Sequence, residues 1–217
     1  MLKYRESKSN SSLMIGYAGR IGPDKMAVVV GVEGAGRKTF ASLYFPSIKL
    51  TEKHIRLSSE VKEVVVAALL DCCHLQNLAE EDMLNELAAT IQRWNSQDVR
   101  ILLVLGRADL VCTHRQNREW IEGVMCAYEP YLKKLKANRR AIIAHSNLAV
   151  QRVRQAFDGE LDVDDVEDIN YLLRKVGHRM PHEVTVDNIR AYLRSHRRTL
   201  QMLSGEFYVN RFINVDN

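Results

Sequence analysis

The chain has 217 residues, of which 46% are apolar and 27% are charged, and its formal net charge is +4 at pH 7. That composition is typical of a globular protein and excludes an intrinsically disordered or collagen-like chain. No apolar run approaches the roughly 20 residues that a membrane-spanning helix needs. Because the first residues contain no secretory apolar region, we expect a cytoplasmic protein without membrane association.

The cysteines form no spaced framework; they are Cys72, Cys73, Cys112 and Cys126. Adjacent Cys72 and Cys73 make a poor structural bridge, so we expect reduced thiols. The segments Cys72–His74 and Cys112–His114 bring cysteines and histidines together. They lack the gap of about two to four residues between paired cysteines that structural zinc sites show. The sequence therefore predicts no metal site, and we expect no cofactor.

Residues 1–22 are polar and rich in serine and glycine, which predicts a loosely held N-terminal arm. In the next segment, "KMAVVVGVEGAGRKTFASLYFPSI", β-branched and aromatic residues flank a glycine-rich turn. That arrangement predicts two strands joined by a turn, a small β-hairpin over residues 23–50 that Pro46 helps to end.

From Thr51 onward the pattern becomes helical. In "SSEVKEVVVAALLDCCHL", Ser59 is a candidate N-cap before a nearly continuous apolar run, which predicts a helix at the centre of the core. The stretch "AEEDMLNELAATIQRW" repeats apolar residues with the helical period and predicts an amphipathic helix. The run "VRILLVLGRADLV" fits a buried strand and a buried helix equally well.

The segment "NREWIEGVMCAYEPYLKKLKANRRAIIAHSNLAVQRVRQAF" predicts a long helix, broken before Pro130 and ended at Asp158-Gly159. The segments "ELDVDDVEDINYLLRKVG" and "TVDNIRAYLRSHRRTLQMLSG" each predict a capped helix closed by a glycine, Gly177 or Gly205. Residues 206–217 form a tail, either a short strand or an ordered coil. We therefore predict a mainly α protein, a helical bundle over residues 51–205 with a small N-terminal β-hairpin.

The segment "GVEGAGRKT", Gly31 to Thr39, is similar to the phosphate-binding loop, where a strand is followed by G-x-x-x-x-G-K-[ST]. Gly31 and Gly36 have this spacing, but Arg37 precedes Lys38. One extra residue turns the lysine and the hydroxyl by about 100° around a helix, away from the phosphate. In "LLVLGRADL", Arg107 stands where a guanine-specificity loop has its lysine. A phosphate-loop nucleotide-binding protein is one alternative, and a basic, glycine-rich hairpin turn is the other.

Two groups of basic residues have spacings suited to a phosphodiester backbone. The first is the helical stripe Arg190, Arg194, Arg197 and Arg198, and the second contains Lys133, Lys134, Lys136, Arg139 and Arg140. We predict RNA binding by Lys133, Lys136, Arg190, Arg194, Arg197 and Arg198. The alternative is a solvated face paired with the acidic stretch Glu160–Asp168.

The segment "KANRRAIIAHSNLA" contains an arginine and a histidine inside the predicted long helix. A packed histidine at the edge of the core is one interpretation, and a reactive pair is the other. The residues "NRRAIIAHSN" resemble the RNKxxAHxD signature of HEPN-type helical domains, in particular their abortive-infection-like branch. Arg139 matches the arginine, Arg140 the polar residue after it, and Ala144-His145-Ser146 the close of the motif.

The resemblance implies a metal-independent endoribonuclease of host defence or a toxin–antitoxin system, dimeric so that two motif helices face each other. Arg139 or Arg140 would bind the scissile phosphate, and His145 would be the general acid and base. Asn138 would orient the site, and Ser146 would support it. The expected partners are RNA, a second copy of the chain, and an antitoxin or other protein. The alternative is a non-enzymatic basic helical protein that binds RNA or a protein partner, for instance a viral or mobile-element structural component.

Overall fold

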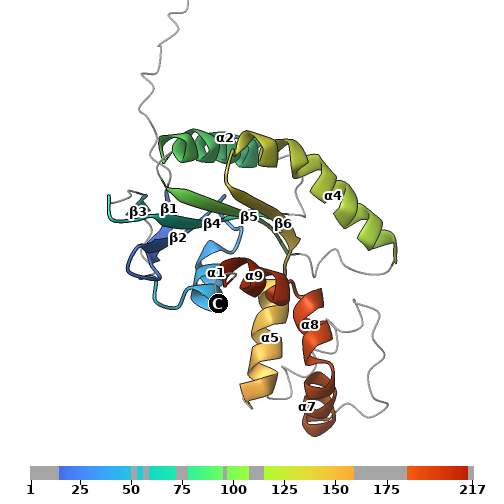
Figure 1. Cartoon of the computed structure of the whole chain (residues 1–217). Coiled ribbons are helices and arrows are strands. Elements are labelled where there is room, and N and C mark those ends of the chain that lie inside the picture. The colour runs from blue at the N-terminus through green and yellow to red at the C-terminus, as the bar shows by residue number, and fades with distance from the viewer. Residues whose placement is uncertain are drawn as a thin grey trace, which may run out of the picture.

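The computed structural model describes residues 15–49, 53–55, 59–71, 78–94, 97–107, 115–158 and 185–214. Over these ranges the chain is an α/β protein built on a mixed β-sheet that helices cover on both faces (Figure 1). The prediction of a mainly α-helical bundle with a small hairpin is therefore wrong.

The sheet consists of β1 (Ile15–Arg20), β2 (Lys25–Gly31), β3 (Lys53–His54), β4 (Glu63–Asp71), β5 (Asp98–Gly106) and β6 (Arg139–Ala144). Their order across the sheet is β3-β1-β2-β4-β5-β6. β2, β4, β5 and β6 run parallel, whereas β1 pairs antiparallel with β2 and with β3. The four parallel strands therefore end along the same side of the sheet, which we call the carboxyl edge.

The helices of the described ranges are α1 (Arg37–Tyr44), α2 (Leu78–Arg93), α4 (Arg115–Lys134), α5 (Asn147–Asp158), α7 (Val186–Ser195), α8 (Arg197–Leu203) and α9 (Glu206–Ile213). α2 and α4 cover one face of the sheet, and α1 and α9 cover the other (Figure 1). α5, α7 and α8 lie together beyond the second face (Figure 1). None of the helices in these ranges is both long and apolar enough to cross a bilayer.

β4 is buried on both of its faces. Val64, Val66, Ala68 and Leu70 belong to the core under α2 and α4, while Val65, Ala67 and Leu69 belong to the core under α1 and α9. A parallel strand covered on both faces is a continuous apolar run, and so is a fully buried helix. The helix predicted for this run is therefore wrong, and the β-branched Val64–Val66 favour the strand that forms.

Of the two strands predicted for the N-terminal hairpin, the first is confirmed as β2 and the second does not form. β1 pairs with β2, with Tyr17 opposite Val29, so part of the predicted arm is a strand. The glycine-rich segment after β2 leads into the helix α1 instead of a second strand. Phe40, Ala41 and Phe45 share the face of this segment that is buried against the sheet, a spacing that suits a helix. Residues 1–14 lie outside the described ranges.

The predicted long helix is divided by a strand. α4 ends at Lys134 with Pro130 inside it, and β6 begins at Arg139 after a turn in which Lys136 has φ 40°. β6 pairs in parallel with β5, which precedes it by a whole helix in the chain. Because that pairing is long-range, the local pattern gives no sign of it. α5 runs to Asp158, the last residue of the described range 115–158.

The amphipathic helix and the last predicted helix are largely confirmed. α2 buries Leu84, Leu87 and Ile91. Thr185 caps α7 by accepting a hydrogen bond from the Asn188 amide at 3.2 Å. A break at His196 then separates α7 from α8.

The tail after Gly205 is helical over Glu206–Ile213, so neither the predicted strand nor the coil forms there. α9 packs into the second core through Val209, Phe212 and Ile213. The predicted acidic helix over residues 160–177 lies outside the described ranges.

Candidate functional site

The structure separates Arg139 and Arg140 from His145. The arginines begin β6, whereas His145 follows its last residue, Ala144. Six residues of strand span about 20 Å, roughly twice the 9 Å or so that they span along a helix. The predicted arrangement of these residues on one helix is therefore wrong.

The residues at the start of β6 are exposed and contact neighbouring elements. Asn138 Nδ2 donates a hydrogen bond to Asp98 Oδ1 at 2.6 Å. Arg140 Nη1 donates to the Leu132 carbonyl at 2.8 Å. The Arg139 guanidinium lies over the Phe212 ring, 5.9 Å from its centroid. These contacts attach the strand to α4, β5 and α9.

His145 is a packed side chain with 1% of its surface exposed. Its Nε2 atom and the Tyr44 hydroxyl form a hydrogen bond of 2.7 Å, and its ring packs edge-on against Phe40 and Tyr44. Burial, with a smaller contribution from the Arg154 guanidinium, lowers the pKa of His145 to about 3. The imidazole is therefore neutral at pH 7 and shielded from solvent.

Ser146 is also buried. Its amide donates to the Ser204 carbonyl at 3.0 Å, and its hydroxyl accepts from the Ala149 amide at 3.1 Å, at the start of α5. The first bond joins the end of β6 to the segment before α9, and the second satisfies an amide in the first turn of α5. They give Ser146 a structural role.

The predicted RNA-binding residues do not form a continuous stripe. The break at His196 places Arg190 and Arg194 on α7 and the other two arginines on α8. Arg197 and Arg198 lie over the rings of Phe157 and Phe207, at 4.6 and 5.6 Å from the centroids. Arg190 Nη1 is 4.0 Å from the Asp187 carboxylate. In the second group, Lys133 pairs with Glu129 at 3.3 Å on the exposed face of α4, and Lys136 is exposed in the next turn.

The segment Gly31–Lys38, which we call the glycine loop, lies at the carboxyl edge between β2 and α1. Gly34 and Gly36 have φ of 81° and 79°, in the left-handed region that favours glycine. Gly36 is the N-cap of α1 and provides no side-chain hydrogen bond to the first turn. The first amides of a helix have no partners within the helix, so they can bind an acceptor from outside it.

The charge at this helix end is unusual. A helix N-terminus carries partial positive charge, and acidic side chains are therefore favoured there. The first turn of α1 has no acidic residue and begins instead with Arg37 and Lys38. The positive charges of Arg37 and Lys38 are repelled by the partial positive charge of the helix end and by each other. A bound anion would remove that repulsion and would accept hydrogen bonds from the helix amides.

The ends of the neighbouring strands contact the glycine loop. Arg107 follows β5, and its Nη1 lies 3.3 Å from Oδ2 of Asp71, the last residue of β4. Its Nη2 donates to the Gly34 carbonyl at 3.4 Å. Asn147 begins α5, and its Nδ2 donates to the Gly36 carbonyl at 3.3 Å. The Asn147 Oδ1 atom is buried and has no hydrogen-bond partner within the described residues.

The loop also lies at a topological switch point. β2 and β4 are hydrogen-bonded neighbours, but the helices α1 and α2 that follow them cover opposite faces of the sheet (Figure 1). In open α/β sheets, ligands bind outside the carboxyl ends of strands at such a point.

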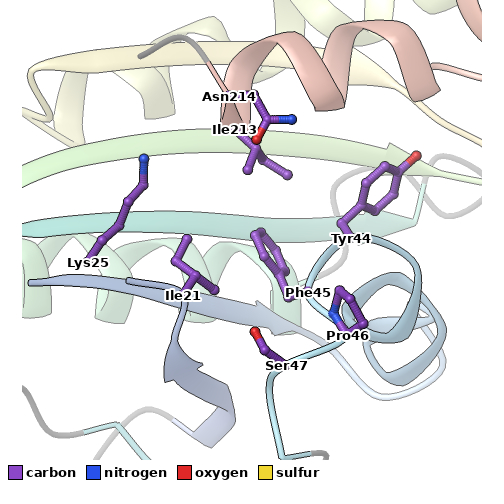
Figure 2. Close-up of a pocket in the computed structure, with 8 residues that line it drawn as sticks. All are labelled: Ile21, Lys25, Tyr44, Phe45, Pro46, Ser47, Ile213 and Asn214. Atoms are coloured by element: carbon purple, nitrogen blue, oxygen red, sulfur yellow. The ribbon is translucent and has the colours of Figure 1, made fainter. Parts of the chain in front are cut away.

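A separate pocket of about 350 Å³ lies near the carboxyl end of α1. It is lined by Ile21, Lys25, Tyr44, Phe45, Pro46, Ser47, Ile213 and Asn214 (Figure 2). Lys25 already forms an ion pair of 2.8 Å with Glu63. In Figure 2 the Tyr44 hydroxyl points away from Lys25, consistent with its bond to His145. The pocket therefore offers less to an anion than the glycine loop does.

Metal ligands do not gather in the part of the chain that the structure describes, where no group of three or more His, Cys, Asp and Glu is placed to hold an ion. The segments Cys72–His74 and Cys112–His114 lie outside that part.

The sequence of the glycine loop departs from the phosphate-loop motif because Arg37 precedes Lys38. The structure places Arg37 itself at the first helical position, directly after Gly36, where the motif has its lysine. A substitution of arginine for lysine thus explains the pattern without an insertion. Asp71 and Asn147 were not predicted as site residues, because recognising them requires knowing where β4 and β6 end.

The parallel sheet with helices on both faces and a glycine loop after its first parallel strand define an open α/β protein with a phosphate-loop-like segment. No protein-family model matches the chain, and no curated protein matches it.

Proposed function

We propose that this chain binds a phosphate-bearing ligand of the nucleotide type, with a phosphate group held by the glycine loop. The observation that carries the proposal is the first turn of α1, which has a glycine N-cap, no side-chain cap and no acidic residue, and begins with Arg37 and Lys38. Each of these features favours an anion, and phosphate is the anion that glycine loops before helices bind most often.

The roles of the residues follow from their places. Amides of the loop and of the first helical turn would donate to phosphate oxygens. Arg37 would add a planar, bidentate guanidinium contact. Asn147 holds the Gly36 carbonyl through its side-chain amide, so α5 helps to fix the loop.

The nucleotide class is supported by what lies beside the loop. Arg107 comes from the end of β5 and retains 44% exposure of its side chain while it contacts the loop and Asp71. An exposed guanidinium offers a flat face on which a base can stack. A cytoplasmic location agrees with such a ligand, and we propose it for this chain.

Endoribonuclease activity, RNA binding and dimerisation stay predictions. The acid and base proposed for that reaction, His145, is buried and neutral, and its proposed partner Arg139 lies at the opposite end of β6. A general acid or base must come within hydrogen-bond reach of its substrate. The contacts of these residues therefore favour the glycine loop as the first site to test.

Calorimetric titration of the full chain with GDP, GTP, ADP and ATP tests the proposal. We expect saturable binding of at least one of them by the wild type. Arg37→Ala should weaken it about tenfold to a hundredfold, since a hydrogen bond to a charged group contributes about 1.5–3 kcal/mol. Arg194→Ala, which removes an exposed guanidinium from α7, is the matched control and should leave affinity unchanged. Absence of binding by the wild type, or equal affinities in both variants, would contradict the proposal.

A further inference from the structure

A phosphate loop of the usual kind implies a magnesium ion. In such loops the hydroxyl of the Ser or Thr directly after the lysine binds Mg²⁺, and a carboxylate at the end of a neighbouring strand completes the protein's contribution. Mg²⁺ requires oxygen donors in near-ideal octahedral geometry. Whether the glycine loop fits the ion therefore depends on the residues at those two positions.

The hydroxyl position is occupied by a cation. Arg37 stands where the motif has its lysine, so Lys38 stands where it has the hydroxyl residue. The Lys38 side chain is exposed and near the uncapped helix end. An ammonium group provides no oxygen and repels a divalent cation, so this position cannot serve Mg²⁺.

The carboxylate at the second position, Asp71, is already engaged in an ion pair. Asp71 ends β4, next to β2 in the sheet, and is the residue best placed to reach an ion beside the loop. Its carboxylate is paired with Arg107 at 3.3 Å, and the same guanidinium holds the Gly34 carbonyl. The other loop carboxylate, Glu33, is exposed on the loop itself. The donor set therefore does not fit Mg²⁺.

We infer that the site takes its ligand as the metal-free anion, with Arg37 and Lys38 supplying the positive charge that Mg²⁺ supplies elsewhere. The inference rests on the proposed function and narrows it to one ionic form of the ligand. Asp71 and Arg107 pair with each other. The loop itself carries Arg37, Lys38 and the positive helix end against one carboxylate, Glu33. This excess of positive charge suits a phosphate group that carries no Mg²⁺.

Titration of the full chain with GDP, GTP, ADP and ATP, in EDTA and in excess Mg²⁺, tests the inference. We expect binding in EDTA and about tenfold weaker binding in Mg²⁺, because the nucleotide must then release its metal ion. Binding that requires Mg²⁺, or is equally tight or tighter with it, would overturn the inference and leave the proposed function intact. No binding in either solution would overturn both.

Lys38→Ser sharpens the test, since it restores a hydroxyl at an exposed position where the fold has little to lose. We expect this variant to lose most of the preference for metal-free nucleotide. Lys133→Ser on α4 is the matched control and should keep the wild-type preference. A Lys38→Ser variant with an undiminished preference for the metal-free form would show that Lys38 does not replace the ion, and would overturn the inference.

Discussion

The glycine loop and the segment Asn138–Ser146 both reach the carboxyl edge of the sheet, yet they present opposite surfaces there. The loop leaves Lys38 exposed and places Arg37 beside an uncapped helix end. The second segment presents His145 there, which is buried and hydrogen-bonded to Tyr44. Its arginines emerge at the other end of the strand.

The difference shows that residue types alone do not locate a functional site. An arginine and a histidine six positions apart suggest chemistry on a helix, but on a strand they are separated by about 20 Å. A displaced lysine suggests a damaged phosphate loop, but the helix begins with an arginine in its place. Secondary structure decides which side chains meet, and burial then decides which can react.

The largest effect on stability is expected at the contact between the end of β6 and the segment before α9. Gly205 has φ 82°, and a Cβ atom there would overlap the Ala144 carbonyl. Gly205→Ala should therefore destabilise the fold by about 3 kcal/mol or more. Gly123→Ala is the matched control, because a Cβ there meets nothing within 4 Å, and it should be neutral or slightly stabilising. Urea unfolding of both variants measures the difference, and equal midpoints would contradict this packing.

The next largest effect concerns His145 itself. His145→Ala removes a buried ring and its bond to Tyr44, which should cost about 2–3 kcal/mol of stability. Nucleotide affinity of the folded fraction should change by less than about twofold. Unfolding and titration of the same preparation report the two quantities separately. A stable His145→Ala protein that has lost ligand binding or RNA cleavage would restore the segment Asn138–Ser146 as a functional site.

A pH dependence of stability follows from the lowered pKa of His145. His145 has a pKa of about 3 in the folded protein and about 6.5 in an unfolded chain. The unfolded state therefore binds more protons between these values, and the stability that the neutral imidazole contributes is complete above about pH 6.5. It should be lost as pH falls toward 3, by about 1.4 kcal/mol per pH unit for one group.

The difference in unfolding free energy between wild type and His145→Ala, measured from pH 7 to pH 5, isolates this contribution. We expect the two curves to converge as the pH falls. Parallel curves would mean that His145 takes up its proton in the folded state, and so that it reaches solvent.

The smallest effect is expected at the basic group on α4. Lys133 and Glu129 form an exposed ion pair one helical turn apart. Lys133→Ala should change stability by less than about 0.5 kcal/mol and leave nucleotide affinity unchanged. Filter binding with RNA and titration with nucleotide check this variant together. A strong loss of RNA affinity would support the predicted RNA-binding surface.

The local sequence pattern predicts the helices α2, α7 and α8, because their apolar period and their caps lie within the segment itself. The period of Leu84, Leu87 and Ile91 indicates α2, and Thr185 and Gly205 mark the beginning of α7 and the end of α8. The run KMAVVVG predicts β2 correctly, but β4, β5 and β6 could not be predicted in the same way. β4 and β5 are apolar on both sides because helices cover both faces of the sheet, and β6 is a strand through its pairing with β5.

Only part of the candidate site can be predicted from the sequence, because the rest depends on contacts between segments far apart in the chain. The spacing of Gly31 and Gly36 is a local signal and was detected. Asp71, Arg107 and Asn147 are separated along the chain and meet only because parallel strands end at one edge. A fold misread as a helical bundle provides no such edge.

The central claim is that the glycine loop is where the ligand's phosphate binds, and amide chemical shifts of the ¹⁵N-labelled chain test it most directly. Titration in EDTA with the tightest-binding of GDP, GTP, ADP and ATP should shift the amides of Gly34, Gly36, Arg37 and Lys38 most, with smaller shifts at Arg107 and Asn147. Shifts centred on Arg139–His145 or on Arg190–Arg198, or a spectrum that all four nucleotides leave unchanged, would contradict the account.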